Sequence, residues 1–270
     1  GLKLFDWVGF DNFTAFFTNP TGEIAARFLP VLAWTLIWAF FATFLNYYGG
    51  ILLALLINRK GLKGKKIFRA IFVLTIAIPQ FVSLLAMRNL IGEYGPLQNF
   101  LVQTGILSEP MSFLANAPNV WTARITIILI NLWVGIPYSM LLASGAIMNI
   151  PESLYEAAKI DGARKFTILR KITMPYIVFI TTPYLISSFV GNITSFNIIY
   201  LLTSGNPKVT GGYIAGGTDL LVTWLYKLTI DEQQYNLGAV IGILTFLITS
   251  IVTLVTYRRS KSYKEEDAFQ

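Results

Sequence analysis

The sequence contains no cysteine and no histidine, and few of its residues carry a charge. Without cysteine the chain can form neither a disulfide nor a thiolate nucleophile, and without histidine it lacks the usual imidazole base and metal ligand. Charged residues make up 13% of the 270 residues and hydrophobic residues 54%, which is too apolar for an ordinary soluble domain. The composition therefore indicates a membrane protein, and we predict no catalytic or metal site on this chain.

Long apolar runs predict an all-α fold, a polytopic membrane helix bundle. A spanning helix needs about 20 mostly apolar residues. The first run is interrupted by Asn46-Tyr47-Tyr48-Gly49-Gly50, which we expect to pack against another helix with its small residues inward. The predicted spans are residues 31–57, 67–90, 121–148, 174–201 and 235–257, with Pro79, Pro137 and Pro183 inside three of them as hinges or as fixed bends.

The connections between these runs are also informative. Residues 1–29 are amphipathic and are expected to lie along the outer membrane surface, and residues 91–120 form a mixed loop. Arg88 and Arg124 lie near the outer ends of their spans, where their side chains can reach water, and we assign them no function. A short helix is expected at 218–228, with Trp224 and Tyr226 as interface anchors or as contacts for a binding protein. Gly238 and Gly242 form a close-packing motif on the last span.

Basic residues concentrate in every second connection between the predicted spans, that is, in the connections on one side of the membrane. Fifteen of the 21 Lys and Arg residues fall in residues 59–69, in residues 149–173 and in the tail 258–270. Since Lys and Arg mark cytoplasmic loops, this pattern predicts a cytoplasmic C-terminus, and the net charge of +7 is a topology signal that argues against nucleic-acid binding. Gly1 would then lie outside, so we expect at least one further span upstream of it.

Residues 149–173, the polar segment, separate two predicted spans. Pro151 and Glu152 suit a helix start, and Asp161-Gly162 would end that helix because glycine adopts the left-handed conformation readily. Residues 163–172 can form a second short helix. From the pattern alone, this helix–turn–helix is either a docking surface, with Glu156 offered to a basic group, or an ordinary basic loop.

The polar segment resembles the EAA signature of ABC-importer permeases. Glu156-Ala157-Ala158, Gly162, Ile172 and Pro175 match it, with Met174 where leucine is usual. The resemblance implies an ABC type I importer permease core and a coupling helix seated in a cytoplasmic ATPase. The implied coupling residues are Glu156, Ala157, Ala158, Asp161 and Gly162.

Other stretches are similar to the larger permease subunit of maltose/maltodextrin-type importers, among them residues 10–13, 53–58 and 218–224. This similarity implies four kinds of partner: a second permease, two ATPase subunits, an extracytoplasmic sugar-binding protein and an oligosaccharide substrate, most simply a maltodextrin. A permease for a galacto-oligosaccharide is the alternative within the family. The implied location is a bacterial or archaeal cytoplasmic membrane.

Intramembrane polar residues mark a candidate substrate path. Asn131, Gly135 and Tyr138 are spaced to lie on one helix face, and Asn192 and Ser195 would share a face of the fourth span. Amides and aromatic rings suit sugar hydroxyls and the apolar face of a pyranose, although hydrogen bonds between helices would explain them equally. The resemblance favours sugar binding at these five residues, with smaller side chains than the family pattern at Gly191 and Ser195.

The chain has no nucleotide-binding loop of its own. Residues 61–66 lack the spacing and the hydroxyl of a Walker A motif, so we expect no cofactor here and ATP with Mg²⁺ on a partner ATPase. An ion-coupled secondary transporter would instead need intramembrane carboxylates and internal repeats. A scaffold that transports nothing would not need a polar cavity.

Overall fold

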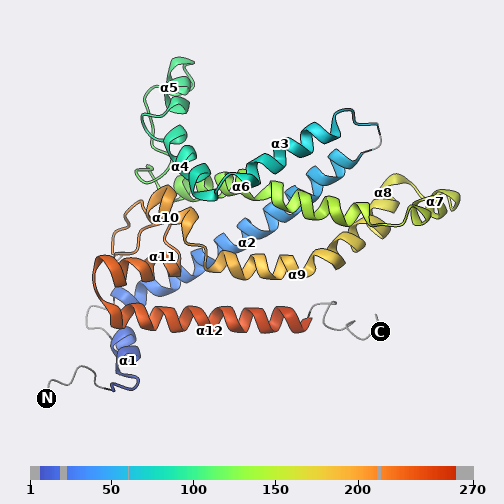
Figure 1. Cartoon of the computed structure of the whole chain (residues 1–270). Helices are drawn as coiled ribbons and strands as arrows, with labels where there is room; N and C mark the ends of the chain where they lie inside the picture. Colours follow the sequence, from blue (N-terminus) through green and yellow to red (C-terminus); the bar gives the residue numbers. More distant parts are fainter. Residues whose placement is uncertain (1–6, 19–22, 60, 212–213, 260–270) are drawn as a thin grey trace. The chain divides into compact units, whose positions relative to one another are not determined.

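The computed structural model describes residues 7–18, 23–59, 61–211 and 214–259, and these ranges contain helices and loops without a strand (Figure 1). The all-α prediction is confirmed. In chain order the helices are α1 Asp11–Thr18, α2 Glu23–Asn58, α3 Lys65–Ala77, α4 Gln80–Ile91, α5 Pro96–Gln103, α6 Val120–Met148, α7 Glu152–Ile160, α8 Lys165–Ile168, α9 Met174–Ile193, α10 Asn197–Thr203, α11 Leu221–Tyr226 and α12 Tyr235–Arg259, with π-helical turns at Leu169–Thr173 and Lys227–Asp231.

Four helical stretches are long and apolar enough to cross a membrane: Ile24–Asn58, Val120–Met148, Lys165–Ile193 and Tyr235–Arg258. The bent pair Lys65–Ala77 and Gln80–Gln103 makes a fifth if the pair is counted as one span. The first of these helices begins earlier than expected, because α2 starts at Glu23 and carries Pro30 inside it. The amphipathic lead-in therefore consists of α1 and the first turns of α2.

The second predicted span is broken at Pro79. Ile78 adopts an extended conformation, with φ −76° and ψ 127°, because the ring of a following proline disfavours the helical region for the residue before it. Pro137 and Pro183, by contrast, lie inside α6 and α9. Only Pro79 therefore separates two helices.

The polar segment forms a helix–turn–helix whose second part continues into the next span. α7 follows Pro151 and ends near Gly162, which has a φ of +72°. α8 then runs through the π-helical turn Leu169–Thr173 into α9, giving one apolar stretch, Lys165–Ile193. The separate short helix expected at 163–172 is thus the first part of the span.

Two units of the chain each hold a compact core, and we describe each by itself. Unit 1 contains the described residues up to Ala39, Leu84–Leu129 and Ile193–Ile251, and unit 2 contains Phe40–Ser83, Ile130–Asn192 and the residues from Val252 onward. The core of unit 1 includes Phe16, Phe28, Trp224 and Leu228. The core of unit 2 includes Tyr47, Met140 and Ile177.

Glycines bring helices close together in both units, as predicted. In unit 2, a Cβ atom on Gly50 of α2 would lie 2.4 Å from the Cβ of Ser139 on α6. In unit 1, a Cβ on Gly238 of α12 would lie 2.3 Å from Cγ2 of Thr229. Both contacts are too short for a side chain larger than hydrogen.

Candidate functional site

A polar face of α2 runs through unit 2. Thr43, Asn46, Tyr47 and Gly50 are spaced i, i+3, i+4 and i+7, so they lie on one side of the helix, and all of them are buried. The hydroxyl of Tyr47 lies 2.7 Å from Oγ1 of Thr181 on α9. This face supplies neutral hydroxyl and amide groups to the surrounding helices.

Asn131 and Gly135 occupy successive turns of α6. A Cβ on Gly135 would lie 2.3 Å from Nδ2 of Asn46, so the glycine leaves room for the amide of α2. Asn131 is 4% exposed, and its Nδ2 has no hydrogen-bond partner within the described part of the chain; the same is true of Oδ1 of Asn46. A buried amide without a partner has a high desolvation cost, which a bound ligand can offset.

Tyr138 is less buried than Asn131, with 46% of its surface exposed. Its ring lies 5.4 Å from the ring of Tyr184, between centroids, and it lines a cavity of about 200 Å³ together with Trp133, Gln80 and Ser83. None of the nine residues that line this cavity is charged. The cavity combines aromatic rings with neutral hydrogen-bonding groups.

Gln80 and Ser83 were missed as site residues in the sequence. They belong to the first turn of α4, which begins at the Pro79 break. A polar pair three residues apart, directly after an intramembrane proline, was the available signal.

Asn192 and Ser195 do not share a helix face. α9 ends at Ile193, and Ser195 lies in the break before α10, so the helical spacing assumed for the fourth span does not hold. Nδ2 of Asn192 donates to Oγ1 of Thr43 at 2.9 Å. Asn192 is therefore tied to the polar face of α2, whereas Ser195 belongs to unit 1.

The turn of the polar segment presents its side chains to the surroundings. Glu156, Ala157, Asp161 and Gly162 are exposed, and Ala158 is half-buried. The turn is closed by the N–H of Ala163, which donates to the carbonyl of Ala158 at 2.8 Å. The residues expected to couple to a partner thus form one short, ordered surface.

Two large apolar side chains accompany this surface. Ile160 is 87% exposed and Phe166 is 71% exposed, although both lie among charged residues. Exposed apolar residues inside a charged segment are typical of a protein interface. Neither Ile160 nor Phe166 was among the coupling residues predicted from the sequence.

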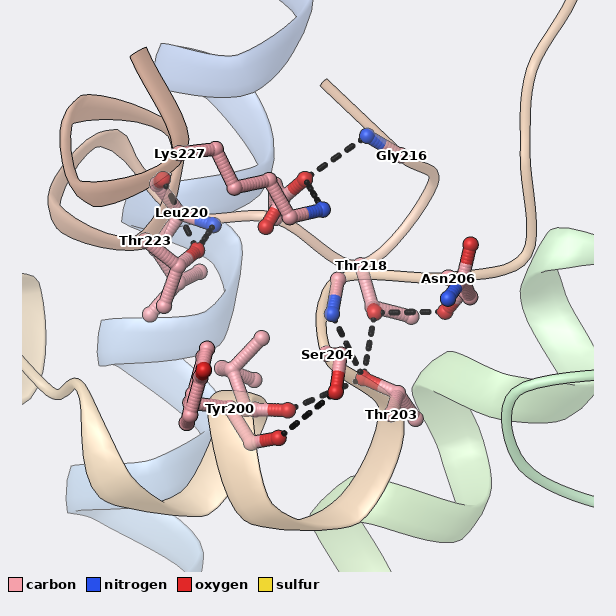
Figure 2. Close-up of polar contacts among 12 residues, drawn as sticks. Tyr200, Thr203, Ser204, Asn206, Gly216, Thr218, Leu220, Thr223 and Lys227 are labelled. Carbon is pink, nitrogen blue, oxygen red and sulfur yellow. Dashed lines mark hydrogen bonds and ion pairs between the residues drawn. The ribbon is translucent and has the colours of Figure 1, made fainter. Parts of the chain in front are cut away.

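A second polar network lies in unit 1, around residues 216–219 (Figure 2). Three successive carbonyls accept hydrogen bonds from distant helices: Gly216 from Arg27, Gly217 from Arg124 and Thr218 from the indole N–H of Trp34. The distances between donor and acceptor are 3.4, 2.9 and 3.1 Å respectively. This segment is therefore held by α2 and α6.

Asp219 follows these carbonyls and is paired with Lys227 at 2.7 Å. Its second partner is the N–H of Gly216, also at 2.7 Å. Burial raises the pKa of Asp219 above its ordinary value, and the charge of Lys227 acts in the opposite direction. A carboxylate that is 1% exposed needs such partners to remain charged.

Arg124 and Trp224 differ from the expectations for them, whereas Arg88 is exposed as expected. Arg124 lies over the rings of Trp34 and Trp121, 4.2 and 5.0 Å from their centroids, and Arg88 donates to the carbonyl of Leu201. Trp224 is fully buried in the core of unit 1, so it is neither an interface anchor nor a contact for a binding protein. All three side chains hold unit 1 together.

The family relationship rests on residues 46–261, which match the binding-protein-dependent transport system inner membrane component family. The chain belongs to this family. The match contains the polar face of α2 from Asn46 onward, the polar segment and the 216–219 network. A chain of this family is a multi-pass membrane protein.

Curated relatives of this family match almost the whole chain. The galactooligosaccharides transport system permease protein of Bacillus subtilis is 40% identical over 98% of this chain and 62% of its own length. The maltodextrin transport system permease protein of the same organism is 36% identical over 98% of the chain and 61% of its own length. The maltose/maltodextrin permease protein of Escherichia coli is 34% identical over 94% and 49%. The chain spans about half to three-fifths of the length of these relatives.

Solved structures agree with the fold. A chain of a bacterial ABC transporter for the acidic polysaccharide alginate superimposes with a TM-score of 0.73 at 24% identity, covering 94% of this chain and 84% of that one. A chain of an amino acid ABC transporter gives a TM-score of 0.56 at 16% identity, covering 91% and 97%. The permease fold is therefore shared by transporters of different substrates.

Proposed function

We propose that this chain is the membrane-spanning, non-enzymatic subunit of an ATP-driven importer for a neutral oligosaccharide. The supporting observation is the uncharged cavity beside Tyr138, which combines two aromatic residues with Gln80 and Ser83. Amide and hydroxyl groups can exchange hydrogen bonds with sugar hydroxyls, and aromatic rings pack against pyranose C–H groups. The sugar permeases among its relatives support the same class.

The proposed sugar site combines this cavity, which Tyr138 lines, with Asn131, Gly135 and Asn192 of the same unit. Ser195 belongs to unit 1 and is left out of the proposal. Asn131 contributes an unpaired amide, and a sugar hydroxyl would satisfy it. A galacto-oligosaccharide and a maltodextrin remain the two candidate substrates, since relatives for each are 40% and 36% identical to the chain. These sugars differ in the configuration at C4 of the sugar unit and in linkage, and not in polarity.

The test is uptake of a panel of labelled oligosaccharides by the whole importer in proteoliposomes with internal ATP. Wild type should take up neutral oligosaccharides of one linkage, and Tyr138→Ala should reduce uptake at saturating binding protein. Tyr235→Ala is the matched control, because Tyr235 is 64% exposed at the start of α12 and is not one of the residues that line the cavity. Unchanged uptake by Tyr138→Ala would contradict its role in the sugar site.

The same assay separates the proposal from an ion-coupled transporter. Uptake should require ATP inside the vesicle and persist when ionophores remove the ion gradients. The reverse pattern would identify secondary transport. In the proposed complex, ATP and Mg²⁺ bind the partner ATPases, and a second permease and an extracytoplasmic binding protein complete the assembly.

The polar segment is the proposed contact for the ATPase. Glu156→Lys reverses an exposed charge and should reduce co-purification of the ATPase and sugar-stimulated ATP hydrolysis, while membrane insertion stays normal. Ile160→Asp should have the same effect, because an interface buries such an apolar side chain. Glu109→Lys is the control for charge reversal, since Glu109 is exposed outside the segment. Normal co-purification of both variants would contradict the coupling role.

A further inference from the structure

Unit 1 contains a cavity of about 440 Å³ that the proposed transport site does not use. It is lined by the last turn of α4, by the turn that precedes α5 and by residues 112–116. Its volume lies within the range of about 300–1,000 Å³ that is usual for small-molecule sites. The helix α4 contributes to both cavities, with its first turn at Tyr138 and its last turn here.

Hydrogen bonds hold the walls of this cavity in place. The amide of Gln98, a residue that is fully buried, donates to the carbonyl of Met111 at 2.5 Å and accepts the N–H of Met111 at 3.2 Å. This pair fixes residues 111–116 to α5. Arg88 is fixed in turn, because its Nη1 donates to the carbonyl of Leu201 at 3.2 Å.

A glycine makes the tight turn at the cavity possible. A Cβ on Gly95 would lie 2.4 Å from the carbonyl oxygen of Asn89 and 2.6 Å from that of Leu90. Any other residue would force this backbone away from α4. The cavity is therefore built by the fold and does not depend on a ligand to form.

The chemistry of the lining favours a neutral polar ligand. Arg88 and Glu93 carry opposite charges, so the cavity has no net attraction for an ion of either sign. Asn89, Asn116 and Ser112 provide amide and hydroxyl groups, and Tyr94 contributes an aromatic ring that is 84% exposed. Hydroxyl-rich ligands with an apolar ring face satisfy both kinds of group.

We propose that this cavity is a second saccharide subsite, separate from the cavity at Tyr138. It would hold one end of an oligosaccharide through Tyr94, Asn89 and Asn116. This inference rests on the proposed function, because it takes the ligand class from it. An apolar ligand would leave the amides without hydrogen bonds. A charged ligand would be repelled by either Arg88 or Glu93, depending on its sign.

The natural absence of cysteine allows a direct test. In a Ser112→Cys or an Ala115→Cys variant, which changes a lining residue but keeps Tyr94, Asn89 and Asn116, the introduced residue is the only thiol among residues 1–270. The whole importer, purified without the binding protein, is labelled with a maleimide that shifts this chain on a gel. The probes are maltotetraose and a galactotetraose, each compared with an equal concentration of glycerol.

We expect the matching tetrasaccharide to slow labelling at both positions about threefold at about twice its dissociation constant, because only the empty fraction reacts. Gln103→Cys is the control, since Gln103 is exposed at the end of α5 and does not line the cavity. Its labelling rate should not change. Equal protection of Gln103→Cys would indicate a general conformational change and would overturn the subsite.

Failure of the subsite and failure of the proposed function have different results. If the importer takes up an oligosaccharide but that sugar protects neither cysteine, the second subsite is wrong and the function stands. If no sugar is taken up and none protects, the assignment to sugar transport fails as well. Protection that appears for glycerol would also overturn the proposal, because the site would then not distinguish a saccharide.

Discussion

The polar networks of the two units differ in charge. In unit 1, residues 216–219 are held by Arg27, Arg124 and the ion pair of Asp219 with Lys227. In unit 2, the face of α2 contacts its neighbours through neutral groups, such as Tyr47 with Thr181 and Thr43 with Asn192. Removing one partner of a buried ion pair is costly, whereas a neutral hydrogen bond contributes little net stability.

This difference indicates what each network can do. An ionic network with fixed partners keeps a loop in one conformation. A neutral network can exchange a partner for a sugar hydroxyl at small cost, and Asn131 already has an amide nitrogen without a partner among the described residues. The following changes test whether unit 1 is held more strongly than unit 2 and whether unit 2 binds a ligand.

Loss of Lys227 should have the largest effect. Lys227→Met leaves the buried Asp219 carboxylate unpaired and should lower the free energy of unfolding of the complex by about 3–5 kcal/mol at neutral pH. Asp219→Asn should cost less, because the lysine side chain is 13% exposed and can reach water, whereas that of Asp219 is 0% exposed. Thermal unfolding in detergent, with Lys208→Met as the exposed control, measures both.

The Lys227→Met defect should shrink in acid. The folded-state pKa of Asp219 already lies above its ordinary value because of burial, and losing Lys227 raises it further. A raised pKa means that the folded state binds the proton more tightly, so this group favours folding at low pH and loses that contribution as pH rises through the folded-state pKa. A defect that stays constant from neutral pH down to the ordinary carboxyl range of about pH 4 would contradict the ionic interpretation.

Gly50→Ala should have the next largest effect. Its Cβ would lie 2.4 Å from Cβ of Ser139 and 2.7 Å from the backbone nitrogen of Met140, so α2 and α6 must separate. We expect a loss of about 1–3 kcal/mol in the free energy of unfolding. Gly145→Ala is the matched control on α6, because nothing lies within 4 Å of its Cβ position, and it should be neutral or slightly stabilising.

Asn131→Leu should separate binding from stability. The buried Nδ2 has no partner to lose, so the melting temperature should stay the same or rise. Sugar affinity should fall about tenfold, the equivalent of one hydrogen bond of about 1.4 kcal/mol. Uptake kinetics and melting are measured on the same preparation. A large drop in melting with unchanged uptake would make Asn131 structural.

Thr43→Val should have the smallest effect. It keeps the shape of the side chain and removes the hydroxyl that accepts the N–H of Asn192 at 2.9 Å. We expect a loss of about 1 kcal/mol in the free energy of unfolding. Thr182→Val is the control, since the hydroxyl of Thr182 bonds only to the carbonyl of Val178 in its own helix. Equal effects of the two variants would show that the bond between helices contributes nothing.

Much of the helical pattern could be predicted from the sequence. Long apolar runs identified the regions of the spans, and Gly162 marked the turn of the polar segment. The helix ends were less predictable: the first span was expected to begin at residue 31, but α2 begins at Glu23 and continues through Pro30, whereas the second span is broken at Pro79. A proline weakens a helix wherever it occurs, and packing against neighbours decides whether the helix continues.

The candidate site was predicted in part. Asn131 and Gly135 lie together on α6, but Asn192 turned out to be bonded to α2 and Ser195 to lie outside a helix. The Gln80 and Ser83 pair was missed because a broken helix was not expected at Pro79. The hydrogen bond from Trp34 to Thr218 joins residues 184 positions apart, and no local pattern indicates such a pair.

The sequence by itself determined that the chain forms apolar helices with a polar segment between two of them, because the length and composition of a segment are local properties that a bilayer selects directly. Only the tertiary structure decided which polar groups have a hydrogen-bond partner and which do not. A side chain such as Trp34 or Asn192 finds its partner far along the chain, at Thr218 and Thr43 respectively, and whether it is satisfied depends on backbone positions that no single segment contains. The contrast between the ionic network at residues 216–219 and the neutral face of α2 therefore exists only in the folded protein.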